Sequence, residues 1–107
     1  MKSAFIKLFG DSPRNRITDF LLDEGRTWDY SLSDIAKHSD VAMSTFNVVW
    51  PSIMKMGIVR QTRIIGKAKM YQLDTQSPYA KALVHLDFDI SKATIKQKHA
   101  TTEKVVA

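Results

Sequence analysis

Four cationic side chains with no accompanying acid lie between residues 58 and 73, and their type and spacing suit one chemical task better than any other. They are Arg60, Arg63, Lys67 and Lys69. Cations gathered on one short segment form a basic patch, and such a patch can bind the phosphates of a nucleic acid. The alternative is a solvated edge strand, on which Lys and Arg prevent the addition of another strand.

A second candidate surface carries no charge. The stretch from 41 to 54 contains neither Lys nor Arg, yet Asn pairs bidentately with adenine and apolar side chains contact thymine methyl groups. Such a surface could select A·T-rich DNA, but it cannot hold phosphates, so the cations must come from residues 58–73 and from Arg14 and Arg16. Asn47 has the alternative of being an ordinary polar surface residue. The outward candidates are Ala42, Met43, Ser44, Asn47 and Val48.

The sequence shows no pattern typical of an enzyme or a metalloprotein. His38, His85 and His99 lie in different segments, without Asp, Glu or Cys at the spacing of metal ligands. There is no glycine-rich phosphate loop and no nucleophile elbow. We therefore expect no catalytic residue, no metal and no cofactor, and no small-molecule ligand is evident.

Composition sets the class of the protein. With 107 residues, 44% of them hydrophobic and 25% charged, the chain has the size of one ordinary globular domain. Its net charge of +5 permits a polyanionic partner. Cys is absent, which favours a cytoplasmic location, and no apolar run approaches the roughly 20 residues of a membrane span.

Apolar spacing and turn residues predict the elements that would position these surfaces. A short N-terminal helix occupies residues 1–10, and Ser12 and Pro13 begin a second helix that stops at Gly25. After an extended piece at 28–31, Ser33 is the expected N-cap of a brief helix. A turn at 40–41, a longer helix to 56, a hairpin at 58–73 and a helix at 77–90 follow, and residues 91–107 form a basic, flexible tail.

The same patterns predict the core and the hairpin register. Phe46, Val49, Trp50 and Ile53 have the spacing of an inward helical face. Trp50 and Trp28 could stack on bases, but we expect both in the core. If Val59 and Tyr71 both face the core, they oppose each other across the hairpin. Arg63 then opposes Lys67, and residues 64–66 form a three-residue loop.

This order of elements resembles the winged helix-turn-helix transcription regulators, especially the small archaeal type. The resemblance covers residues 11–73, within the domain 1–90, and its most specific part is "LSDIAKHSDVAMSTFNVVWPSIMKMGIV". It implies an α+β fold with a three-helix core and a β-hairpin wing. It also implies sequence-specific binding of double-stranded DNA, with the helix at 42–56 in the major groove and the basic wing on phosphates or in the minor groove.

Two departures from the family pattern affect the helix that would read the bases. Ala42 stands where the family often has a capping Ser or Thr. Met43, Asn47 and Val48 stand where it often has Arg, Lys or Gln. A second function therefore remains open, namely a winged-helix module that docks on another protein through this uncharged helix.

Apolar residues at the two ends of the chain exceed what the core requires. They could pack on one another within a monomer, but we expect a homodimer, because helix-turn-helix proteins usually read paired half-sites. The expected dimerisation residues are Phe5, Leu8, Phe9, Leu83, Val84, Leu86, Phe88 and Ile90.

Overall fold

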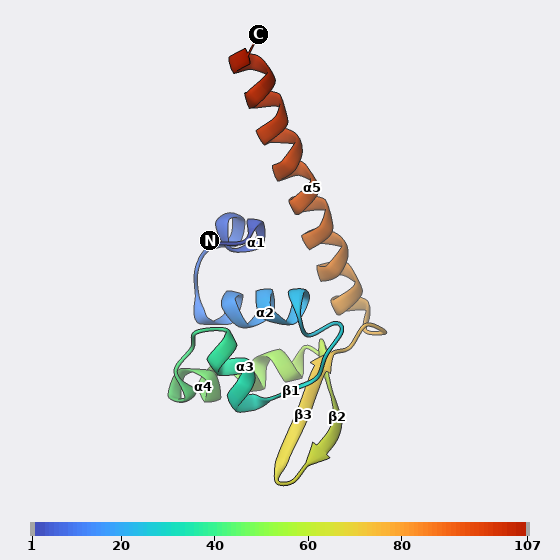
Figure 1. Ribbon diagram of the computed structural model, residues 1–107. Helices are drawn as coiled ribbons and strands as arrows, with labels where there is room; N and C mark the ends of the chain where they lie inside the picture. The colour runs from blue at the N-terminus through green and yellow to red at the C-terminus, as the bar shows by residue number, and fades with distance from the viewer. Residues whose placement is uncertain (1, 107) are drawn as a thin grey trace.

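The structure, a computed structural model, describes residues 2–106 and the side-chain surroundings of residues 2–97. These residues form an α+β domain in which helices pack beside a small antiparallel sheet, so the predicted α+β class is confirmed (Figure 1). The elements are α1 (Ala4–Phe9), α2 (Pro13–Asp23), β1 (Tyr30–Ser31), α3 (Leu32–His38), α4 (Met43–Lys55), β2 (Val59–Ile65), β3 (Ala68–Leu73) and α5 (Pro78–Val106).

The start of α2 follows the sequence prediction, and the start of α3 does not. The Ser12 hydroxyl accepts a hydrogen bond from the Asn15 amide at 3.1 Å, and Pro13 occupies the first turn of α2. The N-cap of α3 is Ser31, whose hydroxyl accepts from the Asp34 amide at 3.2 Å. The prediction of Ser33 was wrong because α3 begins directly at the end of β1, where Ser31 still has the extended backbone that an N-cap requires.

A tight turn joins α3 to α4. Asp40 has a φ of 56°, and Val41 is buried beneath the turn. Ala42 is the N-cap of α4 and makes no side-chain capping bond, as its lack of a polar group requires. On the inner face of α4, Phe46, Trp50 and Ile53 are buried and Val49 is partly buried against the core, which confirms the inward face that the spacing predicts.

Trp28 is not a core residue, in contrast to the prediction. Its side chain is 62% exposed, whereas Trp50 is buried. The aromatic residue that closes the core here is Tyr30, which packs edge-on against Phe20 with ring centroids 4.9 Å apart. Trp28 precedes β1, so the alternation of a strand does not fix its direction.

The strands lie in the order β1-β3-β2, and the hairpin register differs from the prediction. Val59 pairs with Leu73 and Gln61 with Tyr71, a shift of two residues. A bulge at Thr62 shifts the pairing once more, so that Arg63 opposes Met70 and not Lys67. The loop is therefore two residues long, with Gly66 at its first position and a φ of 61°, the conformation that a type II′ turn requires there.

The C-terminal helix is longer than predicted. α5 continues to Val106, so residues 91–106 are helical, in contrast to the predicted irregular tail. Gly and Pro are absent from this stretch, and its Ala, Lys, Gln and Glu residues are good helix formers, so no residue type in it interrupts the helix. α1 lies between α2 and the middle of α5, and the end of α5 projects away from the body (Figure 1). Within residues 2–106 no helix combines the length and the hydrophobicity of a membrane span.

Gly25 is required where the chain leaves α2. A Cβ atom at this position would lie 2.8 Å from the backbone of Leu21, closer than real Cβ atoms approach. We expect Gly25→Ala to lower the free energy of unfolding by about 1–3 kcal/mol, because the backbone must move to relieve the overlap. Urea denaturation measures this change. The control is Lys37→Ala on the exposed side of α3, where the expected change is within about 0.5 kcal/mol. Equal stability of the two variants would contradict the role of Gly25.

Candidate nucleic-acid interface

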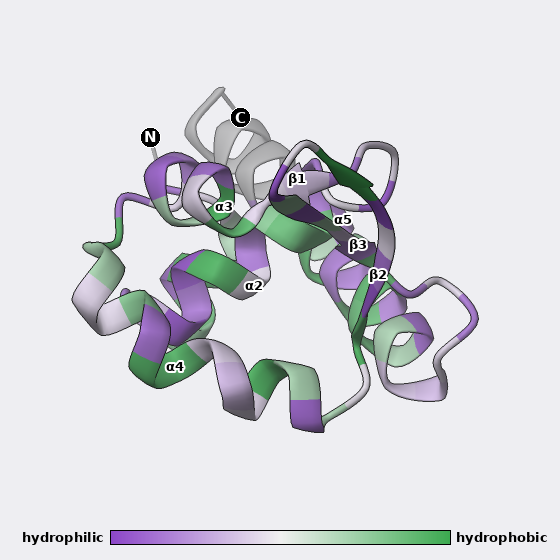
Figure 2. Cartoon of the chain, turned by 90° about the horizontal axis from the view of Figure 1, so that it is seen from below, coloured by the Kyte–Doolittle hydropathy of each residue, from purple (hydrophilic) through white to green (hydrophobic). Residues whose placement is uncertain are grey.

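A groove of about 350 Å³ joins the start of α4 to the hairpin. One wall is Met43, the first residue of α4, together with residues 31–33 at the start of α3. The other wall is the tip of the hairpin, with Lys67 in the loop and Ala68 and Lys69 at the start of β3. The tertiary structure thus brings the start of the uncharged helix and the tip of the basic hairpin to one face. Figure 2 views the molecule from this side, on which α3, α4 and the hairpin lie.

The outer face of α4 is exposed, as its spacing predicts. Val48 is 79% exposed, the most open large hydrophobic side chain among the described residues. Asn47 lies one helical turn after Met43, so both are on the side of α4 that faces the groove. Ala42, Ser44 and Asn47 are exposed too. This face can therefore offer one amide and several apolar contacts to a partner, but no charge.

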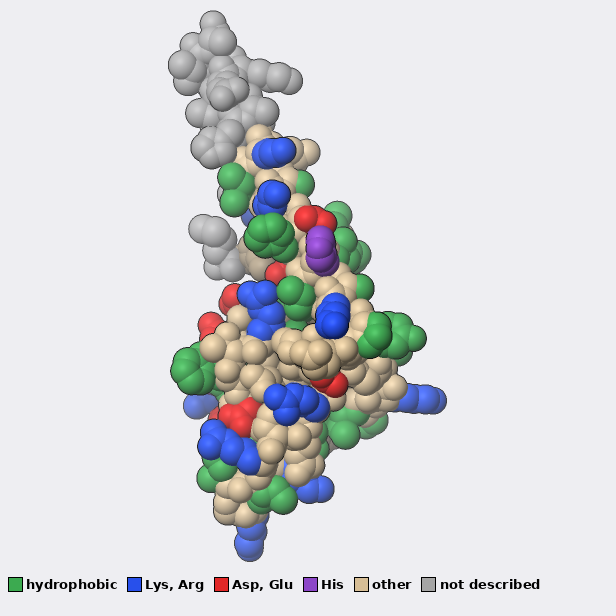
Figure 3. Space-filling view, turned by 90° about the vertical axis from the view of Figure 1, so that its right-hand side faces the viewer, with side chains coloured by type: hydrophobic (Ala, Val, Ile, Leu, Met, Phe, Trp, Pro, Cys, Tyr) green, Lys and Arg blue, Asp and Glu red, His purple; other side chains and the backbone are tan. Residues whose placement is uncertain are grey.

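The hairpin cations fall into two groups. Lys67 and Lys69 are exposed and form no ion pair within the described part of the chain. Arg60 donates a hydrogen bond to the side chain of Gln72, its cross-strand neighbour, at 3.1 Å. Arg63 is bound within the protein. Figure 3 shows Lys and Arg side chains distributed over the lower end of the molecule, where the hairpin lies.

Arg63 forms a bidentate ion pair with Asp29, a residue that the sequence analysis did not single out. Its Nε and Nη2 atoms donate to the two carboxylate oxygens at 2.9 and 3.1 Å. Thr62, at the bulge, donates a third hydrogen bond to the same carboxylate. These bonds, first that of Arg63, lower the pKa of Asp29 to about 2. Nothing in the sequence pairs Asp29 with Arg63, because the contact depends on the bulge and on the order of the strands.

The two arginines of α2 are not brought to the groove with the hairpin. Arg16 pairs with Asp11 at 2.6 Å and donates to the backbone oxygen of Asp40 at 2.9 Å, so it braces the turn before α4. Arg14 donates to the hydroxyl of Ser52, near the end of α4, at 2.7 Å. Its side chain lines a separate pocket beside α5. Of the predicted phosphate-binding residues, Lys67 and Lys69 alone line the groove.

Comparison of the chain with protein-family models, curated proteins and solved structures finds no match. The function must therefore be inferred from the residues of the site.

The Asp29–Arg63 pair makes the acid stability of the sheet testable. Because the folded pKa of Asp29, about 2, is below its usual 3.8, the pair stabilises the fold fully above about pH 4 and progressively less as the pH falls toward 2. In Arg63→Gln we expect the pKa of Asp29 to rise toward 3.8 while remaining below it, because Thr62 still donates. Carboxyl NMR titration of the two proteins measures this shift.

Asp11 provides the internal control for that titration. Its pKa is also about 2, because Arg16 and then Lys2 bind its carboxylate. Arg63 does not contact it, so its titration should be the same in both proteins. An unchanged pKa of Asp29 in Arg63→Gln would show that the ion pair does not form in solution.

Proposed function

We propose that this protein is a sequence-specific, double-stranded-DNA-binding transcription regulator of the winged helix-turn-helix type. The observation that carries the proposal is the groove, in which Met43 at the start of α4 lies across from Lys67 and Lys69 of the hairpin. A helix that enters the major groove with its first turns, beside a basic hairpin on the adjacent backbone, is the geometry by which such proteins bind duplex DNA.

The order of elements supports the same proposal. α3, the turn at Asp40 and α4 follow one another as a helix-turn-helix, α2 packs against both helices, and the hairpin follows α4 directly. In the fold that the sequence resembles, this succession gives the three-helix core and the wing. The hairpin β2–β3 takes the place of the wing.

The proposal assigns different tasks to the helix and the hairpin. Asn47, Met43 and Val48 face the base edges, where they favour adenine and the methyl group of thymine. Lys67 and Lys69, supported by Arg60, neutralise phosphates and supply most of the affinity. Arg63 acts indirectly, because its pairing with Asp29 fixes the hairpin against the loop before β1.

A second candidate function is a protein-docking module, and exposed apolar side chains favour it. Met43, Val48 and Met54 on α4 are all exposed, as are Ile64 and Ile65 near the hairpin tip. Apolar contact with a protein partner would not depend on salt, whereas phosphate binding weakens steeply as salt rises. Salt dependence therefore separates the two functions.

The first test is titration of the protein into random-sequence duplex DNA at two salt concentrations. We expect salt-sensitive binding of micromolar strength or tighter. In the double variant Lys67→Ala/Lys69→Ala, binding to every duplex should weaken, and the log–log salt slope should decrease in magnitude by about two, one for each lost phosphate contact. Absence of binding at low salt would favour the protein-docking function.

Two further variants complete this experiment. Lys92→Ala removes a cation from α5, away from the groove, and should leave DNA affinity nearly unchanged. Asn47→Ala should keep the salt slope and relax the preference among sequences selected by the native protein, at a cost of about 1–3 kcal/mol for the preferred site. If the lysine variant binds as the native protein does, the tasks assigned to helix and hairpin are wrong.

We also propose that the regulator is a homodimer, formed through α5. Of the predicted dimerisation residues, Phe5 is buried within the monomer, and Leu83, Val84 and Ile90 are partly buried. Leu8, Phe9, Leu86 and Phe88 are exposed. Phe88 and Ile95, both exposed, are seven residues apart and so lie only about 20° apart around the helix, on a stripe that a second α5 can cover.

Sedimentation equilibrium tests the dimer. We expect the native protein to be a dimer at micromolar concentration and Phe88→Glu/Ile95→Glu to be a monomer, because each carboxylate would have to be buried in the interface. The control is Ala93→Glu/Gln97→Glu, which places carboxylates on exposed positions about 140° and 180° around α5 from Phe88, and this variant should remain dimeric. A monomeric native protein would contradict the proposal.

A further inference from the structure

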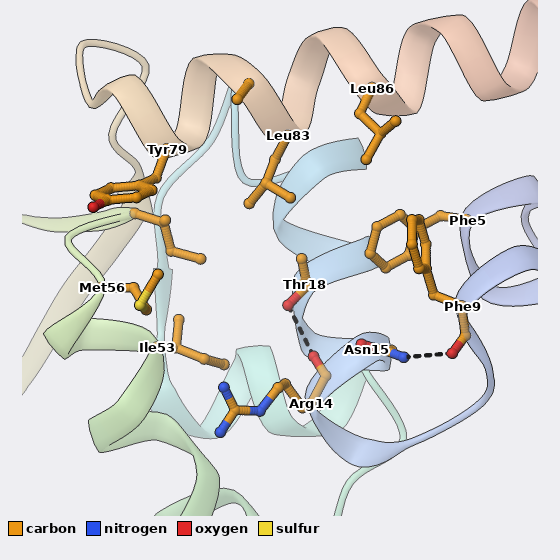
Figure 4. A pocket seen from close by; sticks show the side chains of 12 residues that line it. Phe5, Phe9, Arg14, Asn15, Thr18, Ile53, Met56, Tyr79, Leu83 and Leu86 are labelled. Atoms are coloured by element: carbon orange, nitrogen blue, oxygen red, sulfur yellow. Dashed lines mark hydrogen bonds between the residues drawn. The ribbon is translucent and has the colours of Figure 1, made fainter.

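A second hollow, open to solvent on the side of the domain next to α5, is lined mainly by apolar side chains. Its volume is about 410 Å³, and α1, α2, the end of α4 and the first turns of α5 all contribute to it (Figure 4). Its size is within the range of small-molecule sites, which are mostly apolar with a few polar groups that fix orientation. The apolar walls include Phe5, Phe9, Ile53, Met56, Leu83 and Leu86.

Arg14 is the one charged residue among those that line this pocket. Its guanidinium makes a single hydrogen bond within the described part of the chain, to Ser52 Oγ, and it pairs with no carboxylate there. Ser52 in turn donates to the backbone oxygen of Val49 at 2.7 Å, so the arginine is held by an oriented partner. Since a guanidinium carries five N–H donors, most of those of Arg14 remain free.

The other polar side chains of the pocket are already occupied by the backbone. Thr18 Oγ1 donates to the backbone oxygen of Arg14 at 2.9 Å, and Asn15 Nδ2 donates to the backbone oxygens of Phe9 and Gly10. Figure 4 shows the Thr18–Arg14 and Asn15–Phe9 bonds, with the Arg14 side chain beside Ile53 and opposite α5. The pocket therefore offers an apolar interior and one guanidinium group, that of Arg14, most of whose N–H donors are unbound within the described residues.

We propose that this pocket binds a small apolar monocarboxylate, with the carboxylate on Arg14 and the apolar body between α1 and α5. A carboxylate matches the fork of a guanidinium bidentately, and the absence of a second cation favours a single negative charge. This site does not depend on the proposed binding of DNA, since none of its residues lines the groove beside the hairpin.

Charge favours such a ligand over a second copy of the chain as the occupant. Apolar side chains of a partner helix would cover Arg14 without neutralising it, and burying an unpaired charge is costly. Phe88 and Ile95 form an exposed stripe on another side of α5. Phe88 lies about 160° around the helix from Leu86, which lines the pocket. Dimerisation through that stripe leaves the pocket open.

The test uses octanoate, octanamide and succinate as probes, with binding to the full-length protein measured by isothermal titration calorimetry. Octanoate should bind saturably, one molecule per chain, with a Kd below about 1 mM. Arg14→Gln should weaken octanoate at least about tenfold and change octanamide by less than about twofold, because only the charged bond is lost. Succinate, which lacks an apolar body, should not bind.

Two more variants keep the result interpretable. Ala82→Trp, at the exposed edge of the pocket, should fill the hollow and abolish binding of octanoate and octanamide alike, while thermal unfolding monitors the fold. Lys81→Gln removes a cation from the same helix outside the pocket and should bind octanoate as the native protein does. If Arg14→Gln unfolds, Arg14→Lys replaces it, with intermediate weakening expected because the charge remains and the fork is lost.

Three results would overturn the proposal. They are absence of saturable octanoate binding, equal affinity of the native protein and the Arg14 variant, and a native dimer that Ala82→Trp dissociates. The last result would show that a second copy occupies the pocket.

Discussion

The burial of the inner face of α4 is the constraint on which the rest of the structure depends. Phe46 stacks on Trp50 with ring centroids 5.1 Å apart, and Trp50 meets Tyr71 of β3 edge-on at 5.5 Å. Burying such a side chain contributes about 1.5–3 kcal/mol, so the helix cannot rotate without losing several kcal/mol. Its opposite face is thereby fixed toward solvent, and because Tyr71 belongs to the hairpin, the same contact determines where the hairpin stands relative to α4.

Three arginines are bound to partners within the protein, whereas the two lysines at the groove are not paired within the described residues. Arg63, Arg16 and Arg14 each bind a partner within the protein, through which they join the hairpin to the loop before β1, the turn before α4 to α2, and α2 to the end of α4. The planar guanidinium suits such fixed contacts, whereas the ammonium group of Lys stays hydrated and mobile. Lys67 and Lys69 keep their charge available at the groove. The cations that brace the fold are therefore largely distinct from those proposed to bind DNA.

Predictions from local pattern succeeded where a single element carries the signal. The apolar spacing of α4, the Ser12-Pro13 start of α2 and the stop of α1 at Gly10 all agree with the structure. The errors arose where the structure depends on the exact register of two strands or on the residue at which a strand begins. A register difference of two residues and the bulge at Thr62 together changed the partner of Arg63. Trp28 lies outside the strand and is left in solvent. No Gly or Pro interrupts α5 after residue 91, and the prediction gave too little weight to their absence.

The sequence by itself determined the α+β class, the order of elements and the uncharged outer face of α4, because these follow from periodicity and composition within short segments. Only the tertiary structure decided that Asp29 binds Arg63, that Lys67 and Lys69 face Met43, and that Arg14 lies in an apolar pocket beside α5. Each of these contacts joins segments distant in the chain. Their geometry depends on strand register and helix packing, which burial of the whole core determines and no local pattern encodes.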